Sequence, residues 1–333
     1  MGLSYHAAGQ GASTCSVRPV SARYAIGIDA GGTKLLGGVV DERLVVHHRV
    51  HRLWRGADRQ EVLDVLVDVV EEALVATPEA ERVGFGIPAL MDRERAVARE
   101  CVHLPLAGVA FADLMSERVD RPVVVDNDAN CALLAETRSG AAKGSQNALL
   151  LTLGTGIGGG ILADGRIYRG SGGSAGELGH TVVELDGQEC PCGNRGCLET
   201  VVSGTALGEA ARAVAESRPG SALAKAQTAG REVTGALVTE LAGEGDEDST
   251  AILTEAGRKL GAGLSGLANA FNPEVIVIGG GASAAGDLLL GPARDEFRER
   301  ALGPNRDTPV VVAHFGPEAG MLGAATLALE GER

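Results

Sequence analysis

The chain repeats one pattern twice: an apolar strand runs into a glycine-rich turn and then into a second apolar strand. The two copies read YAIGIDAGGTKLLGGVV from Tyr24 and NALLLTLGTGIGGGIL from Asn147. Equivalent residues share one spacing of 123 positions: Ala25 and Ala148, Gly31 and Gly154, Gly37 and Gly160. An internal repeat of this kind indicates two related α/β lobes. Two such lobes, each opening on a glycine hairpin, would face each other across a cleft suited to a nucleotide.

Further strands and helices extend both copies. In the first half the periodicity predicts strands at 24–32, 33–41, 43–53, 82–90 and 122–128 and helices at 59–76, 111–119 and 129–140, in the order βββαβαβα. In the second half it predicts a strand from 147, a hairpin at 161–170, a third strand in HTVVE at 180–184, and strand segments at 274–283 and 308–315. A helical insert at 204–272, interrupted by the acidic stretch GEGDED, and a last helix at 319–329 complete the chain.

These elements divide the chain into four segments. Residues 1–23 are mixed small residues without period, which indicates a disordered leader outside the fold. We expect a small α/β lobe at 24–138 and a larger lobe, with a cysteine-rich knuckle and the helical insert, at 139–318. The segment 319–333 is expected to be a helix that packs back on the small lobe.

Composition excludes several classes of partner. The net charge of -14 repels phosphate backbones and anionic lipids, and only 3% of residues are aromatic, so nucleic acid and membrane surfaces are poor partners. The sequence contains neither an apolar run long enough to span a membrane nor an apolar signal core near its start. We therefore expect a cytoplasmic protein with a small-molecule partner. In a reducing compartment, its six cysteines favour a metal site over a disulfide framework.

Three glycine loops end buried strands. In IDAGGTK, the glycines Gly31 and Gly32 would let backbone N–H groups approach a phosphate, Thr33 and Lys34 add donors, and Asp29 could hold hydrated Mg²⁺. The alternative for this stretch is an ordinary tight hairpin. The other two loops contain Gly154, Thr155 and Gly156, and Gly279, Gly280 and Gly281.

The second loop formally matches the dinucleotide fingerprint G-x-G-x-x-G. That fingerprint must open a helix, whereas here the glycines lead into the apolar strand ILADGRIY. A nicotinamide-dependent dehydrogenase is therefore disfavoured, and the chain contains no G-x-x-x-x-G-K-[ST] phosphate loop. The third loop would allow a base or ribose to lie against its backbone.

A cluster of polar residues follows the strand PVVV. Asp126, Asn127 and Asp128 stand where a buried strand meets a helix, which projects side chains from a rigid frame. One of the three is expected to cap the helix, and a cap alone is the alternative interpretation of the whole cluster. A cap needs one residue, so Asn127 could orient a substrate hydroxyl while Asp128 accepts its proton.

A second cluster lies in ELGHTVVELDGQECPCGNRGCLET. His180, Cys190, Cys192 and Cys197 supply one imidazole and three thiolates, a closed tetrahedral set suited to structural Zn²⁺. The alternative is a reduced cysteine cluster without metal. Glu177 and Glu199 flank these ligands, and a bound metal would hold both carboxylates in place.

Six motifs resemble those of one family in order and spacing: IDAGGTK, VVVDNDAN, LTLGTGIGGG, GELGH, CPCGNRGC-LE and VIVIGGG. They are similar to the ROK family (repressors, open reading frames, sugar kinases), and most like its bacterial glucokinases, from about Tyr24 to the C-terminus. The resemblance implies an α/β, actin-like ATPase domain fold, with two RNase-H-like lobes around a central cleft that binds ATP, Mg²⁺ and a hexose.

The resemblance also implies residue roles. Asp128 would be the general base for the sugar 6-hydroxyl. Four residues would bind sugar hydroxyls beside it: Asn127, Glu177, His180 and Glu199. The first loop, Asp29 to Lys34, and the second, Gly154 to Gly156, would bind phosphates, and Gly279 to Gly281 would lie on the adenosine side. His180 would ligate zinc through one ring nitrogen and face a sugar hydroxyl with the other.

Two loops depart from the family pattern. The family's Asn-Leu-Pro-Gly-Trp loop is HLPLAG here, at His103 to Gly108, and its Pro-Gly becomes Pro88-Ala89. Both loops lie near the sugar in the family, so they bear on which hexose is used more than on phosphoryl transfer.

We therefore expect ATP-dependent phosphorylation of a hexose at its 6-hydroxyl, with glucose as the leading substrate. Mannose, fructose, N-acetylmannosamine and N-acetylglucosamine are alternatives, and so is a noncatalytic sugar sensor. A ROK transcription factor is disfavoured by net charge and by the few residues before the first strand. By resemblance, we expect a homodimer or homotetramer. The sequence leaves open the hexose, allosteric regulation and the use of polyphosphate.

Overall fold

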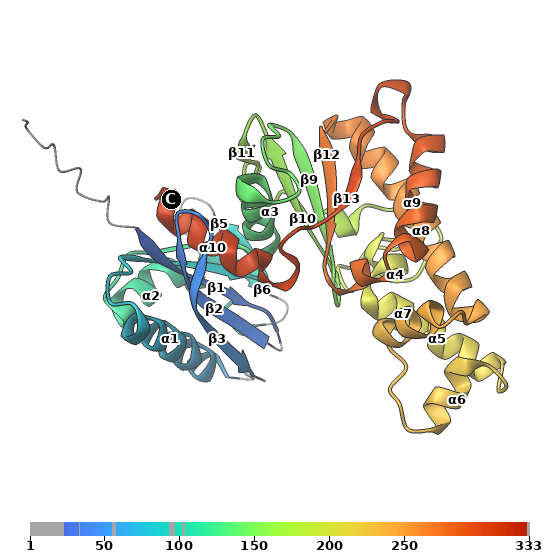
Figure 1. The fold of residues 1–333 in the computed structure, drawn as a ribbon, viewed down its shortest axis with the longest axis horizontal. Coiled ribbons are helices and arrows are strands. Elements are labelled where there is room, and N and C mark those ends of the chain that lie inside the picture. The colour runs from blue at the N-terminus through green and yellow to red at the C-terminus, as the bar shows by residue number, and fades with distance from the viewer. Residues whose placement is uncertain (1–22, 33, 55–57, 93–96, 102–103, 332–333) are drawn as a thin grey trace, which may run out of the picture.

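The computed structural model describes residues 23–32, 34–54, 58–92, 97–101 and 104–331 (Figure 1). The first sheet has the strand order β3-β2-β1-β4-β8. Its strands are β1 (Tyr24–Ala30), β2 (Lys34–Asp41), β3 (Val46–Leu53), β4 (Arg82–Ile87) and β8 (Val123–Asn127). The first three strands are antiparallel, and β4 and β8 add in parallel to β1.

The second sheet has the matching order β11-β10-β9-β12-β13. Its strands are β9 (Ala148–Leu153), β10 (Ile157–Ala163), β11 (Arg166–Ile167), β12 (Val275–Gly279) and β13 (Val310–Val312). The pairing directions match those of the first sheet. Two five-stranded sheets with one topology confirm the predicted pair of RNase-H-like lobes in an actin-like ATPase architecture.

Helices cover both sheets. Helices α1 (Arg59–Ala76) and α2 (Phe111–Val119) belong to the first lobe, beside a small sheet of β5 (Ala89–Asp92), β6 (Val97–Cys101) and β7 (Val109–Ala110). Asp58 begins α1 by accepting the N–H groups of Gln60 and Glu61. The larger lobe carries α4 (Glu199–Val202), α5 (Gly204–Ser217), α6 (Ala222–Thr228), α7 (Gly235–Gly243), α8 (Glu247–Phe271) and α9 (Asp287–Arg300). Leucines of α5, α7, α8 and α9 share one core with β9.

The last helix of each half packs on the sheet of the other half (Figure 1). Helix α3 (Asp128–Ser139) follows β8, yet its Leu133 packs against Gly160 of the second sheet. Helix α10 (Ala319–Glu330) lies against the first sheet so closely that a Cβ on Gly84 would overlap the Ala324 carbonyl. The two helices also touch each other, because a Cβ on Gly323 would overlap the carbonyl of Cys131. This exchange joins the lobes at their shared centre.

The internal repeat is real, with one local difference. Asp29 pairs with Gly86, and 123 positions later Thr152 pairs with Gly279 in the same way. The hairpin loops differ by one residue, because Ala30 pairs with Leu35 whereas Leu153 pairs with Ile157.

Several sequence-based boundaries need correction. HTVVE was predicted as the third strand of the second sheet, but that position is held by β11, and 180–184 forms part of the cysteine-rich knuckle, with an isolated bridge from Val182 to Cys197. The strand predicted at 82–90 is interrupted at Pro88, which has no N–H to donate, and divides into β4 and β5. Asp128 begins α3 and does not end β8. The predicted leader lies outside the described residues, apart from Arg23. Among the described residues, no helix is long and apolar enough to cross a membrane.

Candidate active site

Carboxylates gather where three neighbouring strands of the first sheet end. Asp29 on β1 is in register with Gly86 on β4, and Gly86 with Asp126 on β8. The turn that carries Asp128 packs directly on Gly86, since a Cβ there would lie 3.4 Å from the Cα of Asp128, in ordinary van der Waals contact. Asp128 therefore lies beside the end of β4.

Burial and the neighbouring carboxylate charge change the pKa of Asp29. Desolvation raises the pKa of Asp29 to about 7, although its side chain keeps some solvent contact, and the nearby charge of Asp128 adds to the rise. Lys34 acts in the opposite direction. The predicted phosphate loop and the predicted base are thus electrostatic neighbours. Thr33 of the first loop lies outside the described residues.

The turn from β8 into α3 presents Asp128. Asn127 caps the helix, its Oδ1 accepting the N–H groups of Ala129 at 2.9 Å and Asn130 at 3.3 Å. The capping residue is therefore Asn127 itself, which leaves its Nδ2 group, 3.4 Å from the Ala89 carbonyl, as a donor for a ligand. Asp128 is half-buried in the first turn of α3, and its Oδ1 accepts the Ala129 N–H at 2.9 Å.

His180 lies between the cysteine cluster and Glu177. Its Nδ1 is 3.5 Å from the Cys190 Sγ, and its Nε2 is 3.8 Å from Glu177 Oε2. Burial is the main cause of a raised pKa for Glu177, which His180 lowers and which Asp128 and Glu199 raise further. The three carboxylates and the one imidazole predicted for the sugar site, those of Asp128, Glu177, Glu199 and His180, therefore lie in one electrostatic neighbourhood.

The cysteine cluster fits a structural metal. One ligand atom from each of His180, Cys190, Cys192 and Cys197 lies within 4.8 Å of all the others. The backbone is built for this turn, because Gly193 and Gly196 adopt φ values of 91° and 66° and a Cβ on Gly196 would overlap the Glu184 carbonyl. Without a metal, burial raises the pKa of Cys197 to about 12, which leaves thiols that Zn²⁺ would convert to thiolates. Three thiolates and one imidazole form the donor set that zinc prefers.

Glu199 connects this knuckle to the second glycine loop. Its Oε2 accepts the Ile157 N–H at 2.7 Å, and a Cβ on Gly156 would overlap the same oxygen. Glu199 stands two residues after the candidate ligand Cys197. One carboxylate therefore touches the loop predicted to hold phosphate and lies within electrostatic range of the predicted sugar-binding residue Glu177.

The second loop is also fixed from α5. The Gly204 N–H donates to the Gly154 carbonyl at 2.8 Å, and the Thr205 hydroxyl donates to the Thr155 carbonyl at 2.8 Å. The loop leads into β10 and not into a helix, so the dinucleotide fingerprint is excluded on structural grounds.

The third loop ends β12 beside β9. Gly280 has φ +82°, and a Cβ there would lie 2.5 Å from the Leu153 backbone, so only glycine fits. Around Gly281 a Cβ would meet nothing within 4 Å, which leaves the backbone open to a ligand. Gly279, just before these two glycines, is the last residue of β12.

Two contacts of the site were missed from the sequence. The Trp54 Nε1–H donates to the Gly31 carbonyl at 2.8 Å and so fixes the first glycine loop. Arg169 forms an ion pair with Asp126, with Nη2 2.6 Å from Oδ2. The one signal for the first was that Trp54 is the only tryptophan of the chain. For the second there was no local signal, because its partner is 43 positions away.

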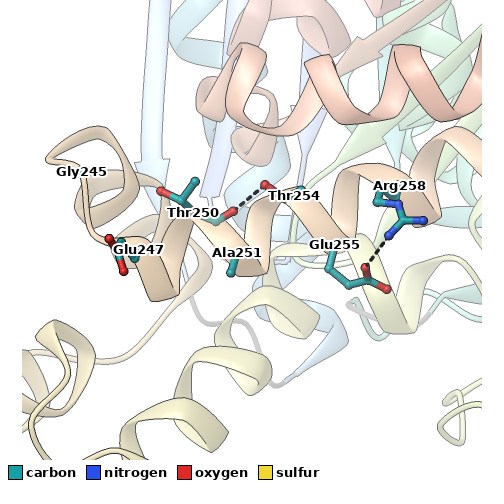
Figure 2. A pocket seen from close by; sticks show the side chains of 7 residues that line it. All are labelled: Gly245, Glu247, Thr250, Ala251, Thr254, Glu255 and Arg258. Atoms are coloured by element: carbon teal, nitrogen blue, oxygen red, sulfur yellow. Dashed lines mark hydrogen bonds and ion pairs between the residues drawn. The ribbon is translucent and has the colours of Figure 1, made fainter.

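A separate surface hollow of about 520 Å³ lies along α8 (Figure 2). Its lining residues come from α8 and from Gly245 just before it, and the Thr254 hydroxyl and the Arg258 guanidinium already have partners on the same helix, Thr250 and Glu255. Residues from one side only cannot enclose a sugar, so this hollow is not the candidate site.

Comparisons with known proteins agree with this architecture. The ROK family model matches residues 25–331. Glucokinase of Streptomyces coelicolor is 36% identical over 92% of this chain and 97% of that protein. The crystal structure of a ROK family glucokinase from Streptomyces griseus in complex with glucose and AMPPNP has a TM-score of 0.84 and 35% identity, covering 92% of this chain and 100% of that one. A xylose repressor of Caldicellulosiruptor bescii is 29% identical over 83% of this chain and 70% of the repressor.

Proposed function

Because this chain belongs to the ROK family, we propose that it is an ATP-dependent sugar kinase that phosphorylates glucose at the 6-hydroxyl. The observation that carries the proposal is the position of Asp128. It begins α3, and its charge acts on Asp29 at the strand end before the first glycine loop and on Glu177 beside His180. A proton acceptor close to both a proposed phosphate loop and a proposed hydroxyl-binding cluster is what phosphoryl transfer to an alcohol requires.

The sugar would be held by groups that select its hydroxyls. Glu177 and Glu199 offer acceptors, Asn127 offers the second hydrogen of its amide, and His180 Nε2 faces the same space as Glu177. Contacts of this kind discriminate strongly between hydroxyl patterns. Glucose is favoured by the named activities of the relatives, and other hexoses remain the alternatives that a substrate panel tests.

The transfer follows from this arrangement. Asp128 takes the proton of the sugar 6-hydroxyl as its oxygen forms a bond to the γ-phosphorus, and the bond between that phosphorus and the β–γ bridging oxygen breaks to release ADP. N–H groups of the glycine loops at 31–34 and 154–156 would donate to phosphate oxygens. Mg²⁺ bound with ATP would supply positive charge beside the phosphates, where Asp29 fits as an acceptor for its hydration shell.

We assign the cysteine cluster to a structural Zn²⁺, with His180, Cys190, Cys192 and Cys197 as ligands. The support is the closed donor set and the two glycine turns around it. Bound zinc would supply rigidity and no reaction chemistry. The knuckle would then orient Glu177 and Glu199 from both sides. The homodimer or homotetramer and the cytoplasmic location stay predictions.

An ADP-release assay across hexoses and N-acetylhexosamines, with a no-sugar control, tests the function. We expect the largest kcat/KM with glucose and none without sugar. ADP release that does not depend on any sugar, or sugar binding without ADP release, would contradict the kinase assignment. The second result would favour a sugar sensor, the activity class of the repressor relative.

A further inference from the structure

A buried ion pair lies directly behind the candidate base. Asp126 is 5% exposed, and its Oδ2 accepts both Nε of Arg169 at 2.7 Å and Nη2 at 2.6 Å. The Arg169 side chain is itself only 15% exposed. A pair this well enclosed is costly to break, because the remaining charge would stay buried without a partner.

The other oxygen of Asp126 holds the turn that presents the base. Its Oδ1 accepts the Asn127 N–H at 2.8 Å and Asn130 Nδ2 at 3.0 Å. Since a carboxylate only accepts, the Asn130 amide must point its nitrogen this way. Asp126 therefore fixes the backbone of Asn127, just before Asp128, and the side chain of Asn130, two residues after Asp128.

Arg169 brings this turn into contact with the second lobe. It follows β11, and its carbonyl accepts the Ala175 N–H at 3.1 Å, which closes the loop that ends at Glu177. Gly170 begins that loop with φ +70°. One guanidinium thus connects the turn carrying the base to the root of the loop carrying a sugar-binding carboxylate.

We propose that Arg169 is a positioning residue for phosphoryl transfer: through Asp126 it holds the turn on which Asp128 stands and ties it to the Glu177 loop. This inference rests on the proposed kinase function. The guanidinium has a second effect, because it offsets the Asp126 charge in a cluster of acids: burial raises the pKa of the neighbouring Cys131 thiol, the charges of Asp126, Asp29 and Asp128 raise it further, and Arg169 lowers it.

Substitutions separate the charge of Arg169 from its geometry. Arg169→Met should lower kcat about 10–100-fold, the cost of misplacing a reacting group, with KM for ATP unchanged. The acid limb of the kcat–pH profile should move to higher pH, because an uncompensated Asp126 disfavours ionised Asp128. Arg169→Lys keeps the charge but loses the two-nitrogen contact, so we expect a smaller loss of kcat and an unmoved acid limb.

The double variant Arg169→Met with Asp126→Asn removes both charges. We expect its acid limb to return to the wild-type position while kcat stays low, because the tie to the second lobe is still missing. The matched control is Arg294→Met, also in the large lobe, where Arg294 donates to the Val310 carbonyl at 2.9 Å and pairs with Asp287. It should lower the thermal midpoint without moving the acid limb.

Hydrogen–deuterium exchange supplies a readout that needs no turnover. The amides of 127–130 should exchange faster in Arg169→Met than in wild type. In the Arg294→Met control they should exchange at the wild-type rate. A lower thermal midpoint with wild-type kcat, acid limb and exchange at 127–130 would reduce Arg169 to a purely structural role and overturn the proposal. Wild-type protein inactive on every sugar would instead contradict the kinase function, while the exchange result would still decide whether Arg169 holds the turn.

Discussion

At equivalent positions of the two sheets, the next-to-last residue of β1 is Asp29 and that of β9 is Thr152. The neighbouring parallel strands carry Gly86 and Gly279 at the same register, so the backbone frames match while the side chains differ. The first sheet places carboxylates at its end, and the second places an uncharged hydroxyl and two glycine loops. Two matching frames therefore carry different proposed roles: the first holds the proposed base and one proposed phosphate loop, and the second holds the other two glycine loops.

The lobes also differ in the connection between their third and fourth strands. In the first lobe, α1 is the helix described between β3 and β4. In the second, the same connection holds the cysteine-rich knuckle and α4 to α8, between Ile167 and Val275. The proposed sugar-binding carboxylates Glu177 and Glu199 both lie in this longer connection. On that proposal, part of the sugar specificity lies in an insertion, where it could change without disturbing either sheet.

The largest predicted effect comes from replacing the proposed general base, Asp128, in the first lobe. Asp128→Asn should lower kcat about 10²–10⁴-fold with glucose affinity retained, because the amide cannot accept the hydroxyl proton. Initial-rate kinetics and calorimetric glucose titration measure the two effects. The control is Asp113→Asn, an exposed acid in the first turn of α2. Near-normal turnover in Asp128→Asn would show that Asp128 is not the general base.

The pH dependence of stability should also come from the first sheet. The Asp29 pKa rises from 3.8 to about 7 on folding, so the unfolded chain releases this proton first as pH increases. Stability contributed here is therefore lost between about pH 4 and pH 7, by a few kcal/mol at most. Asp29→Asn should flatten this part of the curve in urea unfolding without Mg²⁺, whereas Thr152→Val should leave it unchanged. Equal slopes in wild type and Asp29→Asn would show that Asp29 is ionised in the folded protein.

Removing the metal tests the longer connection of the second lobe. We expect zinc-depleted protein to bind glucose about 10–100-fold more weakly, the usual consequence of losing support around a ligand site. ATP affinity should fall less, through the contact between Glu199 and the Ile157 N–H. Calorimetry on protein whose metal content and circular dichroism have been checked measures both constants. Unchanged glucose affinity in folded, zinc-free protein would show that the metal does not support the sugar site.

Much of this comparison was readable in the sequence, because it depends on local patterns. The repeat, the three glycine-ended strands and the spacing of Cys190, Cys192 and Cys197 each lie within a short stretch. The contacts between distant segments could not be read. The ion pair of Asp126 with Arg169 and the packing of α3 on the other sheet depend on which surfaces meet after folding, and period alone does not specify that.

The smallest predicted difference between the two lobes concerns how closely α3 and α10 pack on the sheets that they cover. Both helices rest on strand glycines, but a Cβ on Gly84 would lie 1.8 Å from the Ala324 carbonyl of α10, whereas one on Gly160 would lie 3.1 Å from the Leu133 Cδ2 and 3.2 Å from the Ala129 carbonyl of α3. The first overlap forces the helix backbone to move, whereas the second needs only a small shift of its neighbours. Gly84→Ala should therefore cost about 3 kcal/mol and Gly160→Ala about 1 kcal/mol of unfolding free energy in urea titrations. Equal losses of unfolding free energy in the two variants would mean that the α3 and α10 contacts accommodate an added methyl group equally well.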